Sequence, residues 1–184
     1  MTSNIDLKNV LYDLIGFVIP GAFFIASVIL RVSISNPAII EKINNFKIES
    51  FVVIFLFYIV SYVIGFIISI FGQVIFNLYK KFKFLFLKQN IKPNKNPNLT
   101  NSEKYSILRK SNDSSYFYIE KWNIMKDFSS SLSISIIFIC ILFWDKLEWE
   151  GILFFFLITI ILIETAYTFY RWKVIDLDNS VKNQ

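Results

Sequence analysis

The sequence predicts an all-α, polytopic membrane protein with four transmembrane helices, both termini in the cytoplasm, and a helical cytoplasmic loop between helices two and three. Composition is the first observation behind this prediction. Of the 184 residues, 55% are hydrophobic and only 18% are charged, which is too apolar for a small soluble domain. Four apolar stretches long enough to cross a bilayer are the second, and the concentration of Lys and Arg in one loop is the third. We expect residues 1–184 to form a single membrane domain.

The first apolar stretch covers residues 10–30. At 1.5 Å per residue it would reach roughly 31 Å, enough to cross a hydrocarbon core of about 30 Å. A cleaved signal peptide is the rival interpretation, but the preceding residues carry one Lys against one Asp rather than a basic excess. Pro20 followed by Gly21 predicts a kink, because proline removes a backbone hydrogen bond and its ring clashes with the preceding turn. A static kink and a gating hinge both stay open.

Three further stretches, residues 51–78, 128–144 and 151–172, complete the predicted spans. The stretch of residues 51–78 is the longest, so we expect its helix to tilt or to project into the cytoplasm. The last two spans are separated by the six residues Asp145–Glu150. Connections this short join antiparallel neighbours, which predicts a helical hairpin.

The two longer connections contain signals for further helices. Asn36, directly before a proline, predicts the start of a short helix on the membrane surface. In the loop of residues 79–127, Thr100 and Glu103 have the spacing of a capping box and predict another helix start. A third helix over residues 116–126 is expected to continue into the third span.

Charge determines the predicted orientation. The loop of residues 79–127 contains eleven Lys and Arg residues, whereas the turn between the last two spans has Lys146 alone beside three acidic residues. Basic residues favour the cytoplasmic side of a membrane. The loop is therefore predicted to be cytoplasmic, and four spans then place both termini on the same side. Trp144, Trp149 and Trp172 fall at predicted interfaces, where tryptophan is enriched. The abundance of Asn, Lys, Ile and Phe is typical of a low-GC bacterial genome, so the expected location is a bacterial inner membrane.

A ridge of small residues runs along the second span, at spacings of four, four and three: Ser61, Gly65, Ser69 and Gly72. Small residues at such spacings allow two helices to approach closely in a membrane. We expect the ridge to pack against helices of the same chain or of another subunit. Lining of a pore is the alternative interpretation.

Polar residues are predicted to gather in the half of the bilayer nearer the cytoplasm: Asp13, Gln73, Asn77, Ser129, Ser133 and Glu164. A carboxylate in hydrocarbon is costly, so Glu164 should face protein or water. Two interpretations stay open. The cluster is either a functional polar cavity or ion path that opens to the cytoplasm, or a hydrogen-bonded cluster that sets the register of the helices, with Asp13 at the headgroups.

A basic and aromatic segment follows the second span, where Lys alternates with Phe82, Phe84 and Phe86. Retention of the loop on the cytoplasmic side is its simplest interpretation. Contact with anionic lipid headgroups or with a partner is the second, through Lys80, Lys81, Lys83 and Lys88. Direct binding of nucleic acid is not expected, because the charge of the loop matches no recognised motif.

The residues and motifs of common enzymes are missing. There is no histidine, which is the commonest general base and metal ligand. The single cysteine, Cys140, lies in an apolar run, where we expect it to act as a small hydrophobe. The G-x-x-x-x-G-K, G-x-S-x-G and TVGYG motifs do not occur. We therefore expect no catalytic activity, no metal and no cofactor.

Three segments resemble short bacterial four-span membrane proteins whose first helix carries a "YDL…PG" pattern: Leu11–Leu14 with Ile19–Gly21, Tyr62–Gly65 with Phe71–Gln73, and Glu120–Asn123 with Phe128–Ser129. Ser130 and Ser131 stand where an Arg-Asn pair is common in that group. Similar small membrane proteins are subunits of anti-phage defence systems such as Kiwa and Hailong.

The resemblance implies an oligomeric inner-membrane effector or sensor subunit of a defence system, which could form a pore between subunits when triggered through its cytoplasmic loop. A non-conducting scaffold that recruits a soluble cytoplasmic partner is the alternative. A small transporter is disfavoured, because the sequence has no inverted repeat and no paired broken helices. The expected partners are membrane lipids, further copies of the chain and a soluble protein.

Overall fold

The computed structural model describes residues 12–38, 50–87, 99–111 and 114–182, and every regular element in these ranges is helical. Four of the helices are long and apolar enough to cross a membrane, over residues 14–35, 51–86, 118–142 and 149–177. The predicted all-α fold with four candidate spans is thereby confirmed. The elements are η1 (Leu14–Val18), α2 (Ile19–Ser35), α4 (Ser50–Leu87), α5 (Asn101–Ser111), α6 (Ser114–Leu142) and α7 (Trp149–Lys182).

Three of the long helices extend well beyond their apolar stretches. α4 continues to Leu87, α6 begins at Ser114, and α7 continues to Lys182, whereas hydropathy alone placed these limits at residues 78, 128 and 172. The helices continue because neither proline nor glycine interrupts the charged segments that adjoin the spans. The expected helix over residues 116–126 is thus the first part of α6.

Two helix-start signals have different outcomes. The capping box is confirmed: the N–H of Thr100 donates to the Glu103 carboxylate at 2.7 Å, and the N–H of Glu103 donates to Thr100 Oγ1 at 3.3 Å. The hydrogen bond from the Thr100 N–H lowers the pKa of the Glu103 carboxyl, and a bond from the Thr100 hydroxyl adds to the effect. Asn36 follows the last residue of α2, and Pro37 begins a helical turn. The remainder of the surface helix expected there lies outside the described residues.

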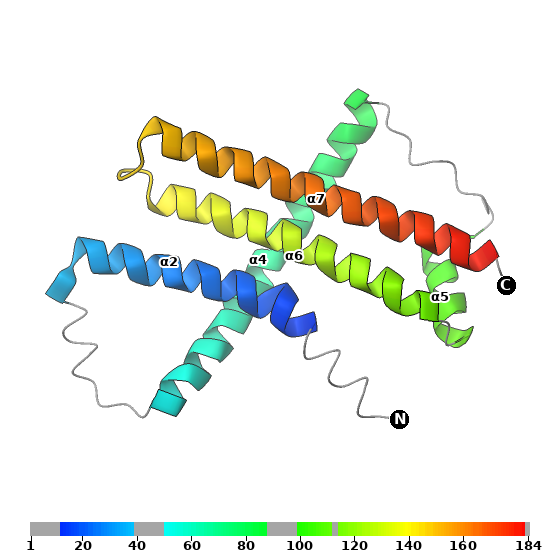
Figure 1. Ribbon diagram of the computed structural model, residues 1–184, viewed down its shortest axis with the longest axis horizontal. Coiled ribbons are helices and arrows are strands. Elements are labelled where there is room, and N and C mark those ends of the chain that lie inside the picture. The colour runs from blue at the N-terminus through cyan, green and yellow to red at the C-terminus, as the bar shows by residue number, and fades with distance from the viewer. Residues whose placement is uncertain (1–11, 39–49, 88–98, 112–113, 183–184) are drawn as a thin grey trace.

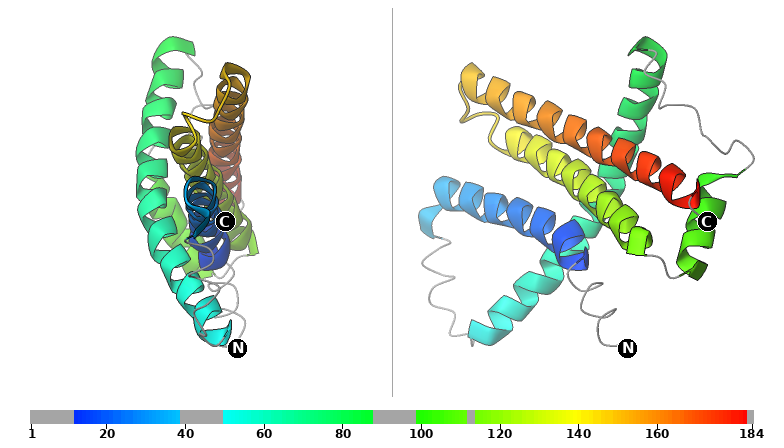
Figure 2. Two further views of the ribbon diagram at one scale, coloured as in Figure 1. Left: turned by 90° about the vertical axis from the view of Figure 1, so that its left-hand side faces the viewer. Right: turned by 45° about the vertical axis from the view of Figure 1, so that its right-hand side comes forward.

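The long helices form two layers (Figures 1 and 2). α2, α6 and α7 lie side by side, with α2 and α6 running in the same direction and α7 running back. α4 forms the second layer and crosses the other three obliquely. We call the end at which α6 begins and α7 ends the basic end, because Lys121, Lys126 and Lys173 lie there. The turn between α6 and α7 lies at the opposite end.

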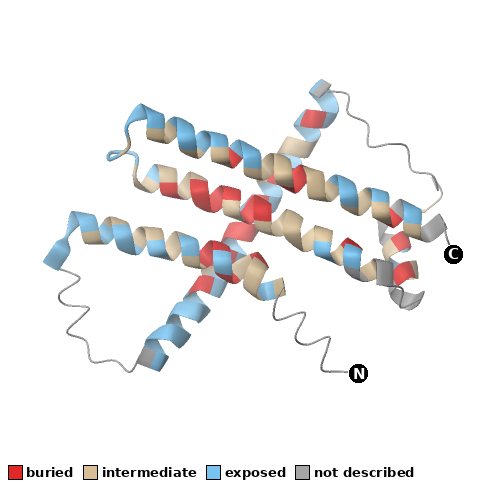
Figure 3. Ribbon diagram, viewed as in Figure 1, coloured by how far each residue is buried: buried red, intermediate tan, exposed pale blue. Residues whose placement is uncertain are grey.

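The buried residues gather where α4 crosses the other layer (Figure 3). A Cβ atom on Gly21 of α2 would overlap the backbone oxygen of Ser61, and one on Gly65 would overlap the carbonyl of Phe17. Further along α4, Gly72 lies against the backbone of Ser130 in α6. The small-residue ridge therefore packs against helices of the same chain, with the backbones almost in contact.

The first span departs from α-helical geometry before Pro20 rather than at it. Leu14–Val18 forms a π-helical turn, which ends with the N–H of Ile19 donating to the carbonyl of Leu14. Such a wider turn moves the preceding carbonyl away from a proline ring with which it would clash. Pro20 and Gly21 are themselves buried in the crossing. The structure thus has a π-turn directly before the residues at which the kink was predicted, in a packed region.

Substitution of Gly65 tests the close crossing. In Gly65→Ala, the added methyl group would overlap the Phe17 carbonyl, and we expect a loss of about 1–3 kcal/mol in stability, as for other overpacked sites. Gly16→Ala is the matched control, because a Cβ atom at that position meets nothing within 4 Å. Both variants gain the higher helix propensity of alanine, so that effect cancels in the comparison. Thermal melts in mild detergent, followed by circular dichroism, give the comparison. Equal melting temperatures for the two variants would contradict the crossing.

Candidate functional site

An ion pair joins α4 to α7 inside the candidate spans. Lys83 Nζ lies 2.5 Å from Glu164 Oε1, and the hydroxyl of Tyr79 donates to the other carboxylate oxygen of Glu164. The Lys83 side chain is 10% exposed and that of Glu164 is 45% exposed. Tyr79 and Lys83 are four residues apart and so share a face of α4. Both oxygens of the carboxylate are therefore engaged by one helix.

Aromatic rings surround the Lys83 ammonium. It lies 4.6 Å from the ring centroid of Tyr167 and 5.4 Å from that of Tyr79, distances at which a cation is attracted to the face of a ring. The two rings meet edge to face, with centroids 6.2 Å apart. The charge of Lys83 is thus balanced by one carboxylate and two aromatic rings, which makes burial of the lysine tolerable.

The same contact continues as an apolar core. Phe76, Ala166 and Tyr167 are buried together, and Tyr170 packs against them. We call Phe76, Tyr79, Lys83, Glu164 and Tyr167 the α4–α7 junction. Two further lysines cover its edges: Lys80 Nζ lies 4.8 Å from the Tyr170 ring, and Lys126 Nζ lies 5.6 Å from the Phe76 ring.

A second cluster lies at the basic end, beyond the junction. Leu108 of α5, Ile119 of α6 and Leu177 of α7 are buried together, with Tyr105 and Tyr116 packed against them. We call α5, with residues 114–127 of α6 and 170–182 of α7, the terminal unit. Burial is the main cause that raises the pKa of Tyr105, and the charge of Glu120 adds to it.

Polar contacts hold the long helices of the terminal unit together. Trp122 Nε1 donates to Asp176 at 2.7 Å, and Lys173 Nζ donates to Asn123 Oδ1 at 2.9 Å. The indole of Trp122 also stacks on Phe169, with ring centroids 5.8 Å apart. Because α6 and α7 pass without a break from the candidate spans into this unit, movement of the unit would be carried directly along both helices.

One ion pair closes the opposite end. Arg31, near the end of α2, donates to both carboxylate oxygens of Asp145 at 2.6 and 2.7 Å. The guanidinium also lies 5.9 Å from the ring of Phe143. The hydrogen bond from Arg31 lowers the pKa of Asp145, so the carboxyl stays charged. This pair ties α2 to the turn between α6 and α7.

The six polar residues predicted to form one cluster do not form it. Glu164 contacts Tyr79 and Lys83, whereas Gln73, Asn77 and Asp13 are exposed. Rotation along the helix explains the difference. The buried face of α4 continues from Gly72 to Phe76 and then to Lys83, and a residue directly after a buried one is turned by about 100°. Gln73 and Asn77 each follow a buried residue directly and therefore point away from the other helices.

Serines of α6 are buried, and four of their hydroxyls donate to carbonyls of α6 itself. Ser135 also donates to the carbonyl of Pro20 in α2, at 3.2 Å. The buried serines are Ser129, Ser130, Ser131, Ser133 and Ser135. Ser130 and Ser131 donate to the carbonyl of Asp127, and Ser133 donates to that of Ser130. When serine hydroxyls donate to backbone carbonyls of their own helix, few polar groups remain to coordinate an ion. The predicted members Ser129 and Ser133 thus serve close packing, which small side chains permit.

The four lysines assigned to lipid or partner contact have different surroundings. Lys83 is buried at the junction, which corrects that assignment. Lys80 is half-buried over Tyr170, Lys81 is exposed, and Lys88 lies outside the described residues. The spacing along α4 could have predicted the burial of Lys83, because Phe76, Tyr79 and Lys83 continue the small-residue ridge at intervals of three and four.

Comparison of the chain with protein-family models, with curated proteins and with solved structures finds no match. The resemblance to membrane subunits of defence systems therefore stays a prediction. Within the ranges that the structure describes, no three acidic or thiol side chains gather as they would around a metal ion. The α4–α7 junction and the terminal unit are therefore the candidate functional features of the described residues.

A double-mutant cycle tests the junction. Lys83→Gln and Glu164→Gln each remove one charge and leave the other partly buried, so both should destabilise the protein, while the double variant recovers part of the loss. We expect a coupling energy of about 1 kcal/mol from denaturant unfolding in detergent. The cycle of Lys81→Gln with Glu164→Gln is the control, because Lys81 is exposed and the two effects should add. Additive effects in both cycles would mean that the ion pair contributes nothing.

Proposed function

We propose that the chain is a multi-pass protein of the bacterial inner membrane, with both termini in the cytoplasm and the terminal unit at the cytoplasmic face of the membrane. The distribution of charge supports this orientation. Lys121, Lys126 and Lys173 lie at the basic end, whereas the turn at the opposite end carries Asp145, with Glu148 and Glu150 just after it. The rule that basic segments stay in the cytoplasm then assigns the basic end to that side.

We further propose that it acts as an oligomeric sensor or effector subunit of a defence system, triggered through its terminal unit. The observation that carries this proposal is the Lys83–Glu164 ion pair. α7 belongs to the terminal unit at one end and holds α4 through Glu164 in its middle. A partner or signal that shifted the terminal unit would therefore pull on α4. Charged contacts between otherwise apolar helices are suited to such coupling, since they have discrete arrangements.

The exposed apolar face of α4 supports assembly of several copies. Residues 51–60 are exposed throughout, and all of them except Leu56 and Tyr58 are Phe, Val or Ile. Each of these side chains must face lipid or another protein. Three buried polar atoms of the described residues, Arg31 Nη1, Ser61 Oγ and Asp127 Oδ1, have no hydrogen-bond partner, and they lie on three different helices. The carboxylate of Glu164 and the hydroxyls of Ser130, Ser131 and Ser133 are engaged within the chain, so an ion path would run between copies rather than through one.

A specific observation also favours the scaffold as a second candidate. A polar groove of about 210 Å³ opens on the terminal unit, lined by Tyr118 of α6 and by Asp176, Asn179 and Ser180 of α7. Hydroxyl, carboxylate and amide groups in one groove are suited to binding a polar segment of a soluble protein. In this function the spans would hold the partner at the membrane and conduct nothing.

Reporter fusions test the orientation. Alkaline phosphatase is active only outside the cytoplasm, so a fusion after Gln184 should be inactive and a fusion near Asn45 should be active. The physical reason is the excess of basic residues at the end where α7 finishes. Activity after Gln184 together with inactivity near Asn45 would reverse the proposed orientation.

Membrane depolarisation tests the coupling. In cells that express the protein with its neighbouring genes and are then triggered, we expect a voltage-sensitive dye to report depolarisation by the wild type. Glu164→Gln retains the hydrogen bond from Tyr79 but loses the ionic contact with Lys83, and should abolish the response. Lys83→Gln should abolish it as well, because the pair acts as a unit.

A control variant and a comparison of the two ion-pair variants show how the depolarisation assay is to be interpreted. Glu150→Gln, which removes an exposed carboxylate at the other end of α7, should respond as the wild type does. If Glu164→Gln alone were inactive and Lys83→Gln were normal, Glu164 would act on an ion path rather than through the pair. A normal response from Glu164→Gln would contradict both ideas. A wild type that never depolarises the membrane would move the scaffold to first place.

A further inference from the structure

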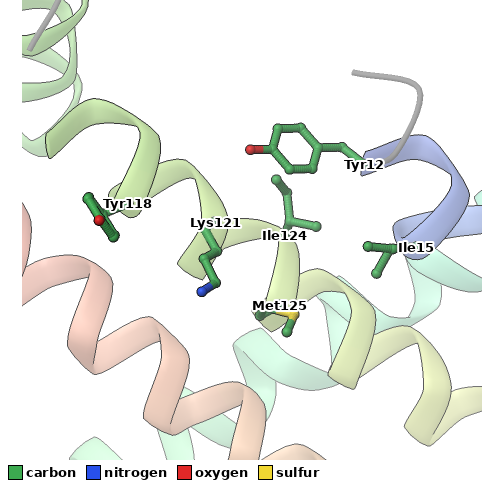
Figure 4. Close-up of a pocket in the computed structure, with 6 residues that line it drawn as sticks. All are labelled: Tyr12, Ile15, Tyr118, Lys121, Ile124 and Met125. Atoms are coloured by element: carbon green, nitrogen blue, oxygen red, sulfur yellow. The ribbon is translucent and has the colours of Figure 1, made fainter. Parts of the chain in front are cut away.

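A groove lies between the start of the first span and α6, away from the α4–α7 junction (Figure 4). Its volume is about 350 Å³, and it is lined by Tyr12, Ile15, Tyr118, Lys121, Ile124 and Met125. The first two residues come from the beginning of the first helix and the other four from α6. This volume lies at the lower end of the range found for small-ligand sites, about 300–1,000 Å³.

The lining of the groove is amphipathic. Ile15, Ile124 and Met125 supply an apolar wall, while Lys121 supplies one ammonium group and two tyrosines supply hydroxyls. Burial is the first cause that raises the pKa of Tyr12, followed by the charge of Glu120, so its hydroxyl remains a hydrogen-bond donor. A ligand that matches this lining has a hydrocarbon part and an anionic oxygen.

The position of the groove narrows the choice of ligand. The candidate spans begin at Leu14 and Tyr118, so the groove lies where the apolar parts of both helices start. Lipid headgroups occupy this level of a bilayer. Lys121 is exposed, and its long side chain can reach a headgroup while its stem covers apolar surface.

We propose that this groove binds one anionic phospholipid, with an acyl chain along Ile15, Ile124 and Met125 and the phosphate at Lys121. Charge complementarity favours an anionic over a zwitterionic headgroup. The segment of residues 79–127 carries eleven basic residues against four acidic ones, and each lysine near the surface adds to the attraction. Glu120, on the same turn as Lys121, and Asp13, directly after Tyr12, are negative charges of the described residues that oppose the headgroup.

Native mass spectrometry tests the proposal. The full chain, freed of lipid in mild detergent, is titrated with phosphatidylglycerol and, separately, with phosphatidylcholine and phosphatidylethanolamine. We expect one phosphatidylglycerol per chain to bind ahead of the other lipids. Lys121→Gln should weaken that binding about fivefold, the contribution expected of one lysine at an anionic lipid surface. Lys146→Gln is the matched control, since it removes an exposed lysine in the turn at the opposite end and leaves the same net charge as Lys121→Gln.

A second variant separates the groove from general electrostatic attraction. Ile124→Trp retains Lys121 but fills the apolar wall, so it should also weaken the binding of phosphatidylglycerol. An equal loss in Lys146→Gln, or wild-type binding in Lys121→Gln, would overturn the proposal. So would a preference for phosphatidylethanolamine, or tighter binding after deletion of residues 2–11, which would identify that segment as the occupant. None of these outcomes depends on whether the protein depolarises membranes.

Discussion

The close crossing of α4 over α2 and α6 is the contact on which the other features depend. Lipid removes the hydrophobic drive that joins helices in water, so helices in a membrane associate through close packing and polar contacts. At the crossing, Gly65 meets the carbonyl of Phe17 and Gly72 meets the backbone of Ser130. A helix is rigid over short distances, and Lys83 lies about 16 Å along α4 from Gly72. The position of Gly72 therefore determines which groups of α7 Lys83 can reach.

The sequence predicted the helical fold and its four spans because apolar length is a strong signal in membrane proteins. It also identified the residues of the ridge, since small residues at spacings of three and four indicate close packing. The polar site was predicted less well. Gln73 and Asn77 were grouped with Glu164 by their depth in the membrane, whereas their contacts depend on rotation about α4. The spacing of Phe76, Tyr79 and Lys83 indicated which face of α4 is buried, but Lys83 was assigned to lipid or partner contact together with the neighbouring lysines.

The charged pair also shows how the chain accommodates a carboxylate in an apolar span. An isolated Glu164 would be expensive in hydrocarbon, and an isolated Lys83 would be costly to bury. Together, with the Tyr79 hydroxyl and the ring of Tyr167, they satisfy one another. The partial exposure of Glu164 leaves the pair weaker than a fully buried one. A contact of intermediate strength is one that a signal can break and that can form again.

The two members of this pair are 81 residues apart, and this separation has a consequence for biosynthesis. Helices enter the membrane in the order in which the ribosome makes them. Until the last helix is made, Lys83 would therefore lie at the membrane surface with its ammonium group hydrated. Glu164 then arrives beside a cation that is already in place, which lowers the cost of inserting its carboxylate. The second helix would thus favour insertion of the final one, and a chain truncated after α6 would lack the carboxylate partner of Lys83.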